Sequence, residues 1–199
     1  MANRSAVLVS FSSIAAAILF FAGTATAAPR VVASIAPVQS LIAGVMEGVA
    51  TPDLIVHGAA SPHSYSLRPS DARALSQAEI VFWIGPIYES FLVKPLKAAA
   101  GKAQIVALAE APDVRTLPTR EGGDWEGDHH RHSRNAGAEP ADGHLFLDPD
   151  NARAIVRQAA EIISQRDPTN AEAYRANRAK VLARLDALDA ELRAALMPV

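Results

Sequence analysis

Histidine is the residue type in this chain that could most directly carry chemistry. His63 lies in a turn-like segment, residues 61–71 (SPHSYSLRPSD), and His144 lies in a second segment, residues 142–149 (DGHLFLDP). Between these segments is a third group that consists of His129, His130 and His132. Imidazole nitrogen is the commonest protein ligand for zinc, so three histidine-bearing stretches in one short chain point to metal binding.

Each histidine also has an ordinary explanation. His63 fits a metal ligand and a solvent-facing turn residue about equally, and His144 fits a ligand or a hydrogen-bonded structural histidine. His57, after a short apolar run, is the least distinctive. The triplet is flanked by acidic residues, a composition that suits loose capture of a divalent metal but also a solvated charged loop. The triplet comprises His129, His130 and His132, and its acidic neighbours are Asp124, Glu126 and Asp128.

The elements that must position these residues alternate between short apolar runs and helical patterns. Pro37 and Pro69 suit the first turns of two helices, and a third helix is expected at residues 87–100. The expected strands are residues 30–35, 53–56, 79–84 and 103–108. Such alternation predicts an α/β fold, a doubly wound parallel sheet with helices on both faces. Ligands on these sheets bind at the carboxyl ends of the strands, where we expect the His63 loop.

Residues 109–141 interrupt this alternation. They are rich in glycine, proline and charge and have little apolar periodicity, so we expect a mobile surface loop. Helices are expected again at residues 152–165 and from Pro168 to about Met197, the second roughly 45 Å long. Its apolar stripe consists of Tyr174, Val181, Leu185, Leu188, Leu192 and Leu196.

The amino terminus resembles a cleaved export signal. Arg4 precedes the apolar run at residues 6–22, and residues 25–27 (ATA) suit a signal peptidase, so we expect cleavage near Ala27 and a periplasmic protein without stable membrane insertion. The apolar run is at or below the length of a membrane-spanning helix. The chain contains no cysteine, which excludes a disulfide framework, and its formal charge of −2 without a basic cluster argues against nucleic acid as a partner.

The order and spacing of the motifs resemble the high-affinity zinc uptake solute-binding proteins of ABC transporters. The resemblance rests on SPHSYSLRPSD at 61–71, VFWIGP at 81–86, the histidine-rich acidic loop, and HLFLDP at 144–149. It implies two α/β lobes joined by a long helix, with transported Zn²⁺ bound in the cleft and delivered to a membrane permease. It further implies that His63, from a turn, and His144, from a strand, are the first lobe's ligands. A separate hypothesis is that the loop histidines are auxiliary metal ligands, and its alternative is an insertion without a role.

Two features depart from that family pattern. Pro62 stands where some zinc-specific members have a glutamate, so this position cannot supply a ligand. The chain also reaches Val199 where the family's second lobe should begin, so we expect an amino-terminal portion with half of a metal site. The expected organisation is a signal at 1–27, a metal-binding lobe at 28–150 that includes the loop at 109–141, and a helix pair at 151–199.

Two other functions fit parts of the sequence. The first is a manganese- or iron-binding relative on the same scaffold, although such relatives usually lack a histidine-rich loop. The second is a small exported zinc-dependent enzyme, which the sequence disfavours because it has no H-E-x-x-H, G-x-S-x-G or Walker-type glycine motif. We therefore expect a non-enzymatic zinc carrier.

Overall fold

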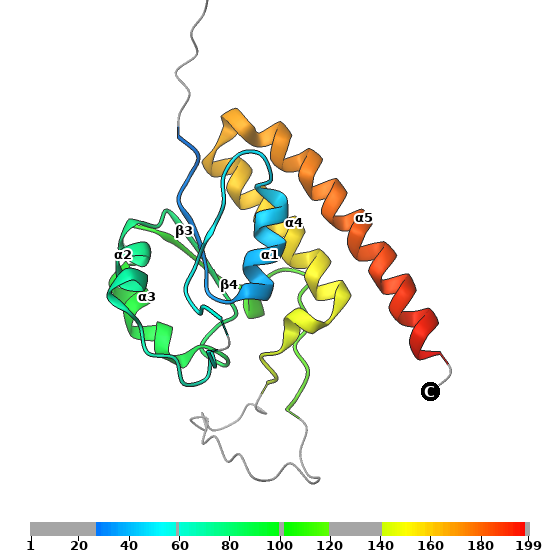
Figure 1. The fold of residues 1–199 in the computed structure, drawn as a ribbon, viewed down its shortest axis with the longest axis horizontal. Helices are drawn as coiled ribbons and strands as arrows, with labels where there is room; N and C mark the ends of the chain where they lie inside the picture. The colour runs from blue at the N-terminus through cyan, green and yellow to red at the C-terminus, as the bar shows by residue number, and fades with distance from the viewer. Residues whose placement is uncertain (1–26, 59, 100–101, 120–140, 198–199) are drawn as a thin grey trace, which may run out of the picture.

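The computed structural model describes residues 27–58, 60–99, 102–119 and 141–197, which form a four-stranded parallel sheet flanked by helices (Figure 1). The strands are β1 (Val31–Ala33), β2 (Asp53–Leu54), β3 (Ile80–Trp83) and β4 (Gln104–Ala107), in the order β2-β1-β3-β4. The predicted parallel sheet is confirmed, with each strand shorter than its apolar run.

The helices cover both faces of the sheet, as predicted for a doubly wound fold. In Figure 1, α1 and α4 lie on one side of the strands and α2 and α3 on the other, while α5 packs outside α1 and α4. The α-helices are α1 (Ala36–Val45), α2 (Pro69–Gln77), α3 (Val93–Ala99), α4 (Pro149–Arg166) and α5 (Ala171–Leu196). The described residues also form four short 3₁₀ helices: η1 (Ser90–Leu92), η2 (Leu108–Glu110), η3 (Leu145–Leu147) and η4 (Pro168–Asn170).

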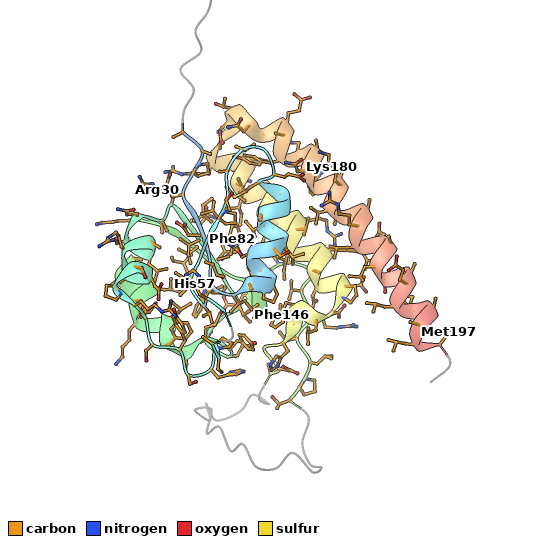
Figure 2. The ribbon with its side chains drawn as sticks, in the orientation of Figure 1. Arg30, His57, Phe82, Phe146, Lys180 and Met197 are labelled. Carbon is orange, nitrogen blue, oxygen red and sulfur yellow. The ribbon has the colours of Figure 1, made fainter. Side chains whose placement is uncertain are left out.

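The core lies between the sheet and its helices. All residues of β1 and β3 are buried, as expected for central parallel strands covered on both faces. The helices contribute apolar stripes, for example Val38, Ile42 and Val45 of α1 and Ile155, Val156 and Ile163 of α4. Figure 2 shows Phe82 of β3 between Arg30, at the amino end of the sheet, and Phe146, near the opposite end.

Helix α5 is attached by its first half and extends away from the lobe. The Asn177 side chain donates to the carbonyls of Val45 (3.1 Å) and Glu47 (2.7 Å) at the end of α1, which satisfies acceptors that the helix leaves open. Of the predicted apolar stripe, Tyr174 and Val181 are buried, whereas Leu188, Leu192 and Leu196 are 45%, 40% and 63% exposed. The stripe is therefore buried along the amino-terminal half of the helix and exposed along the other half.

The start of this helix also differs from the prediction. Residues 168–170 form a 3₁₀ turn, and α5 begins at Ala171, because the Asp167 carboxylate accepts hydrogen bonds from the backbone and side chain of Asn170 (3.3 and 2.8 Å). The same carboxylate accepts the hydroxyl proton of the buried Tyr174 at 2.7 Å. These bonds fix the corner between α4 and α5.

The prediction of a strand at the His144 segment is wrong. Residues Leu145–Leu147 form a 3₁₀ helix, with the Leu147 N–H donating to the His144 carbonyl at 3.1 Å. The Asn151 side chain on α4 donates to the Leu145 carbonyl at 3.0 Å. These partners take the backbone groups that a strand would offer to the sheet.

The helix expected at 87–100 is also modified. A turn at residues 85–89 and the 3₁₀ helix η1 precede α3, so the regular helix is limited to Val93–Ala99.

Among the described residues, no helix combines the length and apolarity needed to cross a membrane. The predicted signal up to residue 26 and most of the predicted loop, including its three histidines, lie outside the described residues.

Candidate metal site

The His63 loop leaves the carboxyl end of β2, as the parallel topology predicts. Its turn is held by the Ser61 hydroxyl, which accepts the His63 backbone N–H at 3.3 Å, and by a Ser64 N–H bond to the Ser61 carbonyl, also 3.3 Å. Local side-chain bonds of this kind stabilise tight turns between prolines. The His63 side chain is thereby presented at the sheet edge where doubly wound folds bind ligands.

A buried carboxylate anchors the far end of this loop. Asp71 of α2 accepts hydrogen bonds from the Arg68 backbone N–H (2.8 Å), the Tyr65 hydroxyl (2.9 Å) and the Ser70 hydroxyl (3.1 Å). Burial alone would raise the pKa of Asp71, but these bonds outweigh it and hold the pKa below its usual value. The ionised carboxylate therefore closes the loop against α2.

His144 is oriented by a carboxylate two residues earlier. Asp142 Oδ1 lies 2.7 Å from His144 Nδ1 and accepts the His144 backbone N–H at 2.9 Å. Burial would raise the pKa of Asp142, yet the two His144 bonds lower it, so the carboxylate stays ionised. A proton held on Nδ1 leaves the lone pair of Nε2 available, the arrangement that orients metal-binding imidazoles in proteins.

The structure brings His63 and His144 together. Their ring centres are 5.7 Å apart, and the rings are inclined by 58°. When one tetrahedral zinc ion lies about 2.1 Å from a nitrogen of each of two imidazoles, the ring centres are about 5 Å apart. The pair therefore has nearly the separation that one shared zinc ion requires.

Two aromatic rings complete the surroundings of this pair. The buried Tyr88 ring lies 4.7 Å from the His63 ring and 5.0 Å from the His144 ring, edge-on to both, and Phe146 lies 6.1 Å from His144. Sequence reasoning identified neither Tyr88 nor Asp142 as part of the site. The D-x-H spacing was a visible signal for Asp142, whereas nothing local linked Tyr88 to two distant histidines.

Within the described ranges, no group of three or more histidine or carboxylate side chains is arranged to hold a metal ion. His57 is not part of the pair; its Nε2 lies 4.0 Å from Asp71. His129, His130 and His132 lie outside the described residues. The described site is thus a pair of imidazoles that needs further donors from water or from elsewhere.

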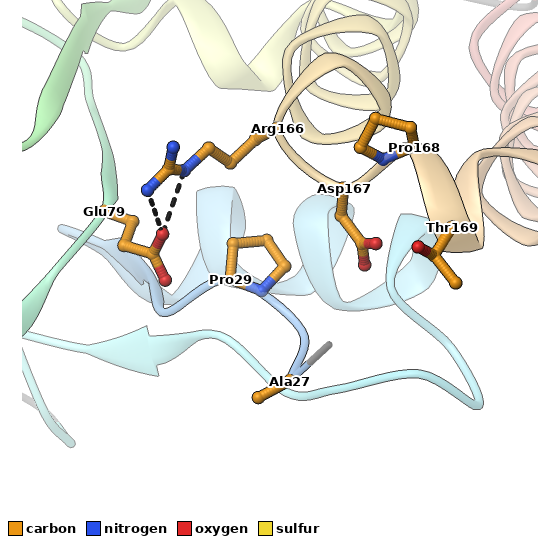
Figure 3. Close-up of a pocket in the computed structure, with 7 residues that line it drawn as sticks. All are labelled: Ala27, Pro29, Glu79, Arg166, Asp167, Pro168 and Thr169. Carbon is orange, nitrogen blue, oxygen red and sulfur yellow. Dashed lines mark hydrogen bonds and ion pairs between the residues drawn. The ribbon is translucent and has the colours of Figure 1, made fainter. Parts of the chain in front are cut away.

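A separate cavity of about 250 Å³ lies at the amino end of the sheet (Figure 3). There Arg166 Nε donates to Glu79 Oε2 at 2.9 Å, which joins the end of α4 to the residue before β3. The lining residues are Ala27, Pro29, Glu79, Arg166, Asp167, Pro168 and Thr169. Without histidine, this cavity is a poor zinc site, and it opens at the opposite end of the strands from His63.

Comparison with known proteins identifies the family. The sequence pattern of the family described as "Zinc-uptake complex component A periplasmic" matches residues 31–199. The chain belongs to this family. The high-affinity zinc uptake system protein ZnuA of Brucella abortus (strain 2308) is 37% identical over 90% of this chain. ZnuA of Yersinia pestis is 38% identical over 70% of this chain.

Solved structures agree with this membership. A crystal structure of ZnuA aligns with 86% of this chain at a TM-score of 0.70 and 27% identity, and a zinc-bound ZnuA deletion mutant aligns with 86% at 0.69 and 28%. A manganese-bound periplasmic protein of Candidatus Liberibacter asiaticus shares the fold at 16% identity and a TM-score of 0.64. The chain spans 62% of the Brucella protein and 60% of the first ZnuA structure.

Proposed function

We propose that this chain is the metal-capturing component of a zinc ABC importer, in which His63 and His144 bind transported Zn²⁺. The observation that carries the proposal is the 5.7 Å separation of the two rings at the carboxyl end of the sheet. The Asp142 carboxylate supports it, because a 2.7 Å bond to Nδ1 leaves the other nitrogen of His144 as the one available to a metal.

Zinc is the metal that this donor set favours. Imidazole suits zinc, whereas manganese prefers carboxylate, carbonyl and water oxygens. Two imidazoles leave two tetrahedral positions open, and we assign these to water or to donors outside the described residues. Manganese or iron binding on the same scaffold is the alternative, and competition between Zn²⁺ and Mn²⁺ for the purified chain separates the two. Displacement of zinc by equimolar manganese would favour the alternative.

The site is tested by calorimetric titration of zinc into His63→Ala and His144→Ala variants. Each variant loses one of two protein ligands, so we expect zinc affinity to fall at least about tenfold. His57→Ala is the matched control, since it removes an exposed histidine that is not part of the pair. Unchanged affinity in both site variants, or an equal loss in the control, overturns the assignment.

The loop histidines have a separate proposed role as auxiliary ligands. We expect the triple variant His129→Ala, His130→Ala, His132→Ala to bind fewer zinc ions while the tightest site keeps its affinity. Stoichiometry from the same titrations measures this. An unchanged stoichiometry means that the loop does not collect zinc.

Family membership supports, but does not test, the remaining assignments. The family description is periplasmic, and the named relatives are zinc uptake proteins rather than enzymes. We propose export by a signal at residues 1–27, a metal-binding lobe at 28–150, a helix pair at 151–199, and delivery of zinc to an ABC permease. Amino-terminal sequencing of exported protein tests the cleavage near Ala27, and hydrolase screening with added zinc tests for an enzymatic role.

A further inference from the structure

We infer that Glu89 is a positioning residue for the histidine pair: its buried carboxyl fixes the turn that places Tyr88 against both His63 and His144. This inference rests on the proposed zinc site and adds a residue that acts on the histidines through Tyr88. Glu89 follows β3, one of the two central strands whose carboxyl ends border the site.

The carboxyl group of Glu89 closes the turn from one side. Its Oε2 accepts the backbone N–H of Ile84 at 2.7 Å and that of Gly85 at 3.3 Å, and the side chain is fully buried. These donors lie at the point where the β3 chain leaves the sheet. The carboxyl oxygen thus pairs two buried backbone N–H groups that would otherwise lack an acceptor.

The backbone closes the same turn from the other side. The N–H groups of Tyr88 and Glu89 both donate to the Gly85 carbonyl, at 3.1 and 3.0 Å. Gly85 has φ +139°, a conformation that side-chain-bearing residues rarely adopt. Residues 84–85 and 88–89 are therefore joined by both side-chain and backbone hydrogen bonds, so the position of Tyr88 depends on the Glu89 carboxyl group.

Tyr88 links this hydrogen-bonded turn to the two histidines. Its ring touches His63 and His144 edge-on, and a Cβ added at Gly143 would lie 2.7 Å from Tyr88 Cβ and Cδ2. The absence of a side chain at Gly143 is what lets the His144 segment approach so closely. A shift of Tyr88 consequently moves one or both imidazoles and changes the separation that a shared metal ion needs.

Burying the carboxyl group of Glu89 in the core costs free energy. Burial raises its pKa to about 7, against the opposing effect of the Ser34 hydroxyl and the Gly85 and Ile84 N–H groups. Among the described residues, neither Glu89 Oε1 nor the buried Ser34 hydroxyl meets hydrogen-bond geometry with a partner. A costly polar group in a core, next to a candidate site, is more typical of a functional than of a packing role.

The test compares Glu89→Ala with Glu89→Gln in the full chain, with two readouts. The first is the NMR imidazole signals of His63 and His144 in metal-free protein, assigned with the corresponding alanine variants, and the second is zinc affinity. We expect the alanine variant to shift both sets of signals and to weaken zinc binding about tenfold, as loss of orienting groups does. The glutamine variant keeps an acceptor oxygen and should retain affinity within about threefold.

Two further variants separate positioning from general destabilisation. Tyr88→Leu removes the ring but keeps apolar volume, so it should shift both imidazoles even if Glu89→Ala fails to fold. Asn177→Ala weakens the α1–α5 contact far along the chain and should leave the imidazole signals unchanged.

Unchanged imidazole signals in Glu89→Ala and Tyr88→Leu, or equal shifts in Asn177→Ala, overturn the inference. A glutamine variant that behaves like the alanine variant overturns it as well. The imidazole readout needs no metal, so it separates failure of the inference from failure of the zinc assignment. That assignment fails instead when His63→Ala and His144→Ala leave zinc affinity unchanged.

Discussion

Asp142 and His144 form a short, self-contained orienting pair: Oδ1 of Asp142 bonds both the ring Nδ1 and the backbone N–H of His144, at 2.7 and 2.9 Å. The Asp142 and His144 side chains are 44% and 47% exposed, so the pair lies at the surface and not in the core. Its effect is to fix which imidazole nitrogen carries the proton and which one is available to a metal.

Removal of this carboxylate should weaken zinc binding. In Asp142→Ala the ring of His144 loses its orienting bond, and second-sphere losses of this kind typically cost about 10- to 100-fold in metal affinity. A competition titration against a fluorescent chelator measures the change. Asp186→Ala, which breaks an ion pair between α5 and α4, is the control and should leave zinc affinity unaltered. Equal affinities for Asp142→Ala and the unmodified chain would contradict the orienting role.

A side chain at Gly143 should disturb the site sterically. The added methyl of Gly143→Ala would lie 2.7 Å from two Tyr88 atoms, so the variant should lose about 1–3 kcal/mol in free energy of unfolding and bind zinc more weakly. Urea unfolding measures the stability. Combining Gly143→Ala with Tyr88→Gly should recover part of the loss, because glycine removes both Tyr88 Cβ and Tyr88 Cδ2, the two atoms in conflict. Strict additivity of the two changes would rule out direct steric conflict.

Glu89 should give the protein a pH-dependent stability. Its pKa is about 7 when folded and near 4.5 when unfolded, so between these values the folded chain holds a proton that the unfolded chain has lost. The free energy of unfolding therefore falls as pH rises from about 4.5 to 7 and is level above. The full effect is on the order of 3 kcal/mol.

Glu89→Gln isolates this contribution. The stability of the variant relative to the unmodified chain should rise with pH through this window, and the difference should be constant above about pH 8. Denaturant unfolding at several pH values measures the difference between the two proteins. Glu79→Gln serves as the control, because that carboxylate is partly exposed and paired with Arg166. A difference that does not vary with pH would refute the buried ionisation.

The attachment of α5 should depend on Asn177. Asn177→Ala leaves the carbonyls of Val45 and Glu47 without their donor, which should cost about 1–3 kcal/mol in free energy of unfolding. Zinc affinity should stay within about threefold, since this contact lies at the end of α1 remote from the strand ends that carry the histidines. Arg184→Ala, on an exposed turn of the same helix, should be nearly neutral. Hydrogen exchange of α5 amides would show whether the loosening is local, and an unaffected α5 would argue against this role for Asn177.

The sequence alone determined the class of fold and the candidate ligands. The buried runs at β1 and β3 and the prolines at the helix starts are local signals, because burial and the fixed φ of proline act within a few residues. The D-x-H spacing before Leu145 is local in the same way. Its 3₁₀ conformation was not predicted, because that depends on Asn151 of α4, which reaches back to the Leu145 carbonyl.

Tertiary structure alone decided the geometry of the candidate site. His63 and His144 are far apart in the chain, and only the parallel order β2-β1-β3-β4 brings their loops to one end of the sheet. Tyr88 acquires its place by contact with both rings, and Gly143 matters only because Tyr88 lies against it. Such relationships depend on packing between distant segments. Residue types and spacing could therefore name the candidate ligands, but not the distance between them or the residues that fix it.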